Sequence, residues 1–131
     1  MMIKPVRIQL SRKRGFSLQE TSAATNGLFA VSVARPTKWG NPWRVVPCGR
    51  LHDGRPAWAG RHDYELNYPM HTRIEAAQRA VACFRDHIAA GKFNCDPAEL
   101  RHTNLACWCA LDMPCHADVL LEAANLMPKD A

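Results

Sequence analysis

The sequence predicts a small α/β protein in which helices pack on one mixed β-sheet. Two observations favour this class. Short strand-like runs occur along the chain together with one long amphipathic helix pattern. The last predicted elements are a strand, a loop and a helix that follow one another directly, and this C-terminal unit carries a Cys/His motif. The 131 residues fit one domain of ordinary size, so we expect a single domain over 1–131.

Three segments have the pattern of short strands. Residues 6–10 alternate apolar and polar side chains, which is typical of a half-buried strand. Residues 28–33 are more apolar and form the second predicted strand. The third covers 104–109, a short apolar run of strand length.

The sequence pattern in the middle of the chain predicts a hairpin. Asp53-Gly54 lies between the apolar segments at 43–46 and 57–58, as the turn of a hairpin would. The stretch over 44–71 is long for a simple connection, so we expect an inserted hairpin or a lid. At the C-terminus, we expect the tail 127–131 to be frayed.

Two helices are predicted. The first begins with the capping box Thr72-x-x-Glu75 and ends at Gly91. Its apolar stripe consists of Ile74, Ala77, Val81, Phe84 and Ile88. The second helix covers 115–125, and Asp118 suits its first turn.

The positive charge is concentrated at the N-terminus. The net charge is +5, and five basic residues precede the first acid, Glu20. Such a patch predicts contact with phosphate or nucleic acid. The residues assigned to this contact are Arg7, Arg12, Lys13 and Arg14. The alternative is a solvated basic strand and turn.

Hydropathy and cysteine usage predict a cytoplasmic protein. No run of about 18 apolar residues could cross a membrane. The basic N-terminus is not followed by the apolar stretch of a secretory signal. Without an export signal, we expect a reducing compartment, no membrane partner and no disulfide framework for the six cysteines.

Three of these cysteines lie within nine residues and are followed by a histidine, in the order Cys107, Cys109, Cys115, His116. Zinc prefers thiolate and imidazole ligands, so one interpretation is a zinc site formed by all four residues or a subset. A second interpretation is catalytic: Cys115 at a helix N-terminus is a reactive thiolate, and His116 is its proton-transfer group. A third is structural, because cysteine is often buried.

The loop Arg35–Trp43 mixes charged, polar and aromatic side chains between two prolines. Arg35 and Lys38 could hold phosphate, Trp39 could stack on a base and Asn41 could contact a base edge or ribose. These four residues are the predicted ligand-binding set. The alternative is a wedge in which the tryptophans fill a gap and the charges face solvent.

Several segments together resemble a known family. They are Arg7–Arg12, Val31–Trp43 with its WGNP motif, Asn104–Cys109, and Pro114–Glu122 with its CHADVL motif. The chain resembles domain of unknown function 4326, a bacterial family that is frequent in phages and prophages. The resemblance marks the WGNP and CWC…CHADVL segments as family motifs and implies an intracellular protein of a mobile element. The segment between Trp43 and Thr72 is longer than expected, and His102-Thr103 replaces an expected Gly-Lys.

We therefore expect a small phage- or prophage-type protein that binds or processes a nucleotide, nucleoside or nucleic acid. Its site would be formed by the Arg35–Trp43 loop and the Cys107–His116 segment, with zinc as the cofactor to test. Whether it is an enzyme is left open at this point. The alternatives are a non-enzymatic nucleic-acid-binding module with a structural zinc, and a phage inhibitor of a host protein.

Overall fold

The computed structural model describes residues 3–51, 53–62, 65–66 and 72–125. The chain forms two compact units. The parallel-sheet unit contains residues 3–40, 95–112 and 117–125, and the hairpin unit contains Asn41–Asn94 and Met113–His116. The predicted α/β class is confirmed. The described strands form a parallel and an antiparallel sheet instead of one mixed sheet.

The parallel sheet has the order β1-β6-β2. β1 spans Arg7–Gln9, β6 spans Asn104–Cys107 and β2 spans Ala30–Ser32. Both outer strands run parallel to β6. All four residues of β6 are buried, and Leu105, Ala106 and Cys107 are apolar, because a central parallel strand is covered on both faces.

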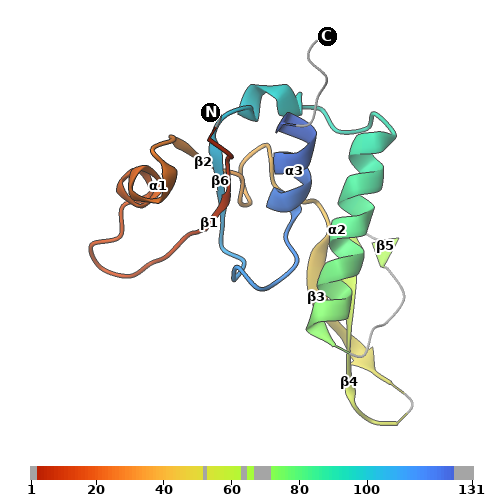
Figure 1. The fold of residues 1–131 in the computed structure, drawn as a ribbon. Helices are drawn as coiled ribbons and strands as arrows, with labels where there is room; N and C mark the ends of the chain where they lie inside the picture. The colour runs from red at the N-terminus through yellow and green to blue at the C-terminus, as the bar shows by residue number, and fades with distance from the viewer. Residues whose placement is uncertain (1–2, 52, 63–64, 67–71, 126–131) are drawn as a thin grey trace. The chain divides into compact units, whose positions relative to one another are not determined.

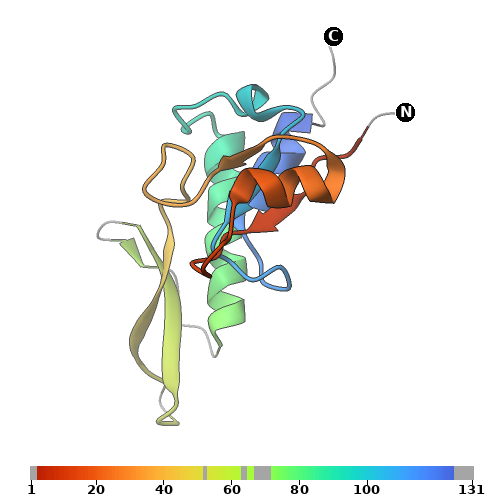
Figure 2. The same cartoon turned by 90° about the vertical axis from the view of Figure 1, so that its left-hand side faces the viewer.

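Two helices cover this sheet, α1 (Leu18–Asn26) on one face and α3 (His116–Asn125) on the other (Figures 1 and 2). On the α1 side, Ile8, Ala30 and Ala106 form a buried cluster. Leu18 at the start of α1 packs against it. The predicted strands and the last helix therefore lie where the sequence pattern placed them, within a few residues.

A buried polar cluster joins α1 to β6. The Asn104 side chain is fully buried. Its Oδ1 accepts hydrogen bonds from Val6 N at 2.9 Å and from Asn26 Nδ2 at 2.9 Å. Its Nδ2 donates to Ser22 Oγ at 2.7 Å and to Asn26 Oδ1 at 2.8 Å. The side-chain amides of Asn26 and Asn104 satisfy each other. The cluster therefore holds α1 on the sheet although this helix has no wide apolar stripe.

The hairpin unit contains an antiparallel sheet of β3 (Arg44–Arg50), β4 (Pro56–His62) and β5 (Glu65–Leu66). Asp53 Oδ1 accepts from Arg55 N at 3.0 Å, and Gly54 has a φ of 89°. On either side of this turn, β3 and β4 pair in antiparallel orientation. The role of the hairpin as an insertion or lid stays a prediction, and the tail 127–131 lies outside the described residues.

Helix α2 (Arg73–Ala89) packs against β3 and β4. The predicted capping box is formed, with Thr72 Oγ1 accepting from Glu75 N at 3.1 Å and the Glu75 carboxylate accepting from Thr72 N. The fully buried residues of α2 are Ala76, Ala80 and Phe84. The apolar stripe is displaced from the predicted one, because Ile74 at its start is 49% exposed.

The structure contains two helical segments that the hydrophobic pattern did not predict, α1 and the 3₁₀ helix η1 (Pro97–Leu100). Helix α1 is capped by Ser17, whose Oγ accepts from Glu20 N, and ends at Gly27 with a φ of 82°. In the described parts of the chain, no helix has both the length and the apolarity that crossing a membrane requires.

Candidate metal centre

Three cysteines come together where β6 ends and the chain turns into α3. Cys107 is the last residue of β6, Cys109 follows after Trp108, and Cys115 immediately precedes α3. Cys107 and Cys115 are buried, and Cys109 is half-buried. The three Sγ atoms all lie within 4.8 Å of one another. None of these three described cysteines forms a disulfide.

This spacing suits a metal ion. In a tetrahedral site with zinc–sulfur bonds of about 2.3 Å, the sulfur atoms are separated by about 3.8 Å. The Sγ atoms of Cys107 and Cys109 lie 3.9 Å apart. Small rotations of the side chains would bring all three sulfurs to ligand distance, so these cysteines could hold a metal ion.

His116 lies beside the cluster. Its Nδ1 is 3.8 Å from the Sγ of Cys115. The imidazole is buried and packs edge-on against the Phe84 ring, with 5.4 Å between ring centroids. Among the described residues, the group of mutually close metal-binding atoms contains the three cysteines and leaves out His116. A metal held by the cysteines alone would have a fourth coordination position for another ligand.

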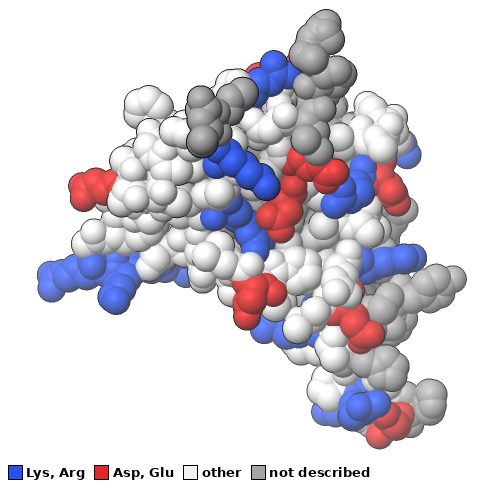
Figure 3. Space-filling view, in the orientation of Figure 1, with Lys and Arg blue, Asp and Glu red and all other residues white. Residues whose placement is uncertain are grey.

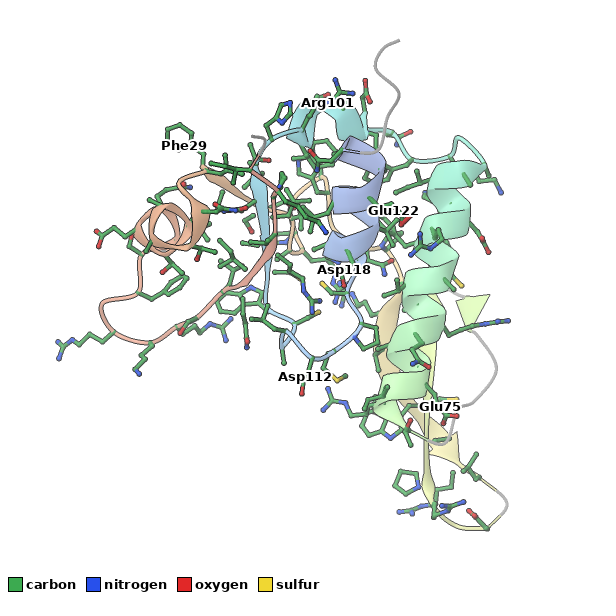
Figure 4. The ribbon with its side chains drawn as sticks, in the orientation of Figure 1. Phe29, Glu75, Arg101, Asp112, Asp118 and Glu122 are labelled. Carbon is green, nitrogen blue, oxygen red and sulfur yellow. The ribbon has the colours of Figure 1, made fainter. Side chains whose placement is uncertain are left out.

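Arg7 holds the loop that connects the cysteines. Its Nη2 donates to the carbonyl oxygens of Leu111 at 2.6 Å and Ala110 at 3.3 Å. Its Nη1 lies 3.6 Å from Asp118 Oδ2. Asp118 belongs to the start of α3 (Figure 4). The Arg7 side chain is only 7% exposed, so its charge is directed into the protein. The contacts favour a role in positioning the loop, and the predicted phosphate contact of Arg7 stays a prediction.

The other predicted phosphate contacts lie on a turn beside the cluster. Arg12, Lys13 and Arg14 are exposed in the segment between β1 and α1. The guanidinium carbon of Arg12 lies 4.7 Å from the ring centroid of Trp108, which is 44% exposed. Trp108 was not among the predicted site residues. The sequence did contain a signal that Trp108 is exposed. It lies between two cysteines that share one face of a strand, and neighbouring side chains in a strand point to opposite faces.

The predicted ligand-binding loop is ordered and partly buried. Trp39 is 5% exposed, and the Lys38 ammonium lies over its ring and 3.4 Å from Glu99 Oε1. Arg35 is exposed. Asn41 is 4% exposed, and its amide donates to Ala80 O and accepts from Trp43 N. Of these four residues, Arg35 and Lys38 present their side chains to solvent; the predicted ligand contacts stay predictions.

Together, the fold and the thiols define a small α/β protein with a three-cysteine cluster beside an exposed basic turn. A family model described as Domain of unknown function (DUF4326) matches residues 16–126. The chain belongs to this family, which confirms the family expected from its sequence. No curated protein and no solved structure matches the chain. The function is therefore argued from the site itself.

Proposed function

We propose that this protein binds zinc through Cys107, Cys109 and Cys115 and uses the centre to bind or process a nucleotide or nucleic acid. The observation that carries the proposal is the mutual distance of the three Sγ atoms, all within 4.8 Å. Thiolates are the preferred ligands of zinc, and the buried positions of Cys107 and Cys115 exclude competing water.

Three protein ligands favour a reactive centre over a closed structural one. Structural zinc sites have four protein ligands, whereas catalytic sites have three and keep one position for water or substrate. Such a zinc ion lowers the pKa of a bound water and polarises carbonyl or phosphoryl oxygens. Phosphate groups would be drawn to the site by the exposed side chains of Arg12, Lys13 and Arg14.

The proposal is tested by metal content. Protein purified without a histidine tag is analysed by elemental mass spectrometry, as wild type and as Cys107→Ser, Cys109→Ser and Cys115→Ser. The wild type should contain one zinc per chain, and each variant should lose most of it. Cys48→Ser, in β3 and outside the cluster, is the matched control and should keep its zinc. A wild type without metal would refute the proposal.

Cobalt substitution then counts the ligands. Three or four thiolates give intense charge-transfer absorption in the near ultraviolet, and tetrahedral Co²⁺ gives visible bands. If the fourth position is open, His116→Ala should keep both the metal and these spectra. If His116 is the fourth ligand, this variant should bind metal more weakly, and the centre would be a closed one.

A second candidate function rests on the contact between Cys115 Sγ and His116 Nδ1 at 3.8 Å. Here Cys115 is a nucleophilic thiolate and His116 transfers the proton. This mechanism predicts metal-free protein in which Cys115 reacts fastest with an alkylating agent, while Cys107 and Cys109 react at ordinary rates. The zinc proposal predicts the opposite, namely protection of all three thiols until the metal is chelated.

A structural zinc gives a third result in the same experiments. Chelation would then unfold the protein, because the free energy of metal binding contributes directly to folding. For the open centre, we expect chelation to remove ligand binding or activity while most of the secondary structure remains. Circular dichroism with and without a chelator separates these two outcomes.

A further inference from the structure

We infer that Trp108 and the turn Arg12–Arg14 bind single-stranded nucleic acid, with an unpaired base stacked on the indole ring. The inference rests on the proposed function and specifies which nucleic acid the protein binds. These residues all belong to the parallel-sheet unit. The contacts among them therefore all lie within one unit.

The first observation is the exposure of Trp108. It lies between Cys107, which is buried, and Cys109, which is half-buried, yet 44% of its own surface is exposed. Tryptophan is enriched at interfaces, where part of its ring is covered and part meets a partner or water.

The second observation is the contact of this ring with a cation. The Arg12 guanidinium carbon is 4.7 Å from the ring centroid, which is the distance of a cation–π contact. The contact holds the indole in one orientation while leaving part of it exposed. A ring that is already ordered loses less conformational entropy when a base stacks on it.

The third observation is the order of the basic turn. Leu10 N donates to Cys107 O at 2.8 Å, which ties the start of the turn to the end of β6. Ser11 Oγ accepts from Lys13 N at 3.0 Å, and Phe16 N donates to Lys13 O at 3.1 Å. Figure 3 shows Lys and Arg side chains projecting from the region between β1 and α1. Three consecutive cations are thus presented beside one aromatic ring.

This combination fits a single strand better than a duplex or a free nucleotide. Aromatic side chains stack on bases that are unpaired, because the bases of a duplex are already stacked inside it. Three adjacent cations can contact successive phosphates of a strand, whereas a free nucleotide offers phosphates at one point only. Proteins that bind single strands combine these same two features, a basic track and stacking rings.

The test is a titration of fluorescein-labelled oligonucleotides with the zinc-loaded protein, followed by fluorescence anisotropy. Short single strands of RNA and DNA are compared with the matching duplex and with nucleoside triphosphates as competitors. Trp108→Ala should weaken single-strand binding by roughly tenfold or more, and Trp108→Phe should keep most of the affinity because it retains a stacking ring.

The charges are tested by salt dependence. The logarithm of affinity falls with the logarithm of salt concentration by about 0.7 per neutralised phosphate of a single strand. Replacing Arg12, Lys13 and Arg14 with alanine should therefore lower the slope by about 2. Phe29→Ala removes an aromatic ring that is 78% exposed, and Lys92→Ala removes an exposed charge on another part of the chain. Both controls should bind like the wild type.

The zinc content of every variant keeps the two proposals apart. Trp108→Ala with full zinc and weakened binding supports the inference. Unchanged binding by Trp108→Ala, or equal affinity for duplex and single strand, would overturn it. If triphosphates bind but no oligonucleotide does, the inference is wrong while the proposed zinc centre and nucleotide function stand. If no zinc is found but single strands bind through Trp108, the zinc proposal fails and this inference holds.

Discussion

The polar cluster around Asn104 predicts an unusually large effect for one asparagine. In Asn104→Ala, Val6 N loses its acceptor, Ser22 loses one hydrogen bond and Asn26 loses two. An unsatisfied buried group costs about 1–3 kcal/mol, and each ordinary bond contributes about 1 kcal/mol. Ser22 keeps its bond to Leu28 O, so its hydroxyl is not left unsatisfied. With the lower value for the part-buried Val6 amide and about 1 kcal/mol for each of the three lost bonds, the free energy of unfolding should fall by about 4 kcal/mol.

The measurement is urea unfolding followed by far-UV circular dichroism, together with amide hydrogen exchange at Val6. We expect a lower midpoint with an unchanged slope and faster exchange of the Val6 amide. Thr25→Ala is the matched control on α1, because the exposed Thr25 hydroxyl donates to the Thr21 carbonyl of its own helix. It should change stability by less than about 0.5 kcal/mol. A loss below about 1 kcal/mol in Asn104→Ala would refute the reasoning.

Three further substitutions test the packing of other elements, each by urea or thermal unfolding. Gly40→Ala should cost about 1–3 kcal/mol, because the new Cβ would lie 2.7 Å from Arg35 Cγ; a neutral result would mean that Arg35 moves freely. Phe84→Ala, at a fully buried position, should cost about 3–5 kcal/mol, whereas Ile74→Ala on the exposed part of α2 should cost less than about 1 kcal/mol. Thr72→Ala removes the capping box and should cost about 1 kcal/mol, and an unchanged midpoint would show that the cap does not stabilise α2.

The elements that the sequence predicts well are those with an apolar pattern. β6 is apolar from Leu105 to Cys107, and α2 has both a capping box and periodic apolar residues. Helix α1 was not predicted because its contacts are polar, with Ser22 and Asn26 bonded to Asn104. The capping signals Ser17-x-x-Glu20 and Gly27 were present in the sequence and could have identified it.

The candidate site was predictable in location but not in detail. Close spacing in sequence was enough to group Cys107, Cys109 and Cys115. The sequence could not distinguish exposed from buried polar residues in a loop, so Asn41 looked as accessible as Lys38. In the structure Asn41 is 4% exposed, because its amide satisfies backbone groups of α2 and of its own loop.

The order of strands in the parallel sheet determines when it can form. Within the described part of the chain, β1 and β2 do not pair with each other, and both pair with β6, which lies far later in the sequence. During synthesis, both early strands must therefore wait with unsatisfied edges until residues 104–107 leave the ribosome. The hairpin and α2 are local in sequence and can form earlier. A nascent chain stalled before β6 would present two open strand edges, which makes it a natural substrate for chaperones and proteases.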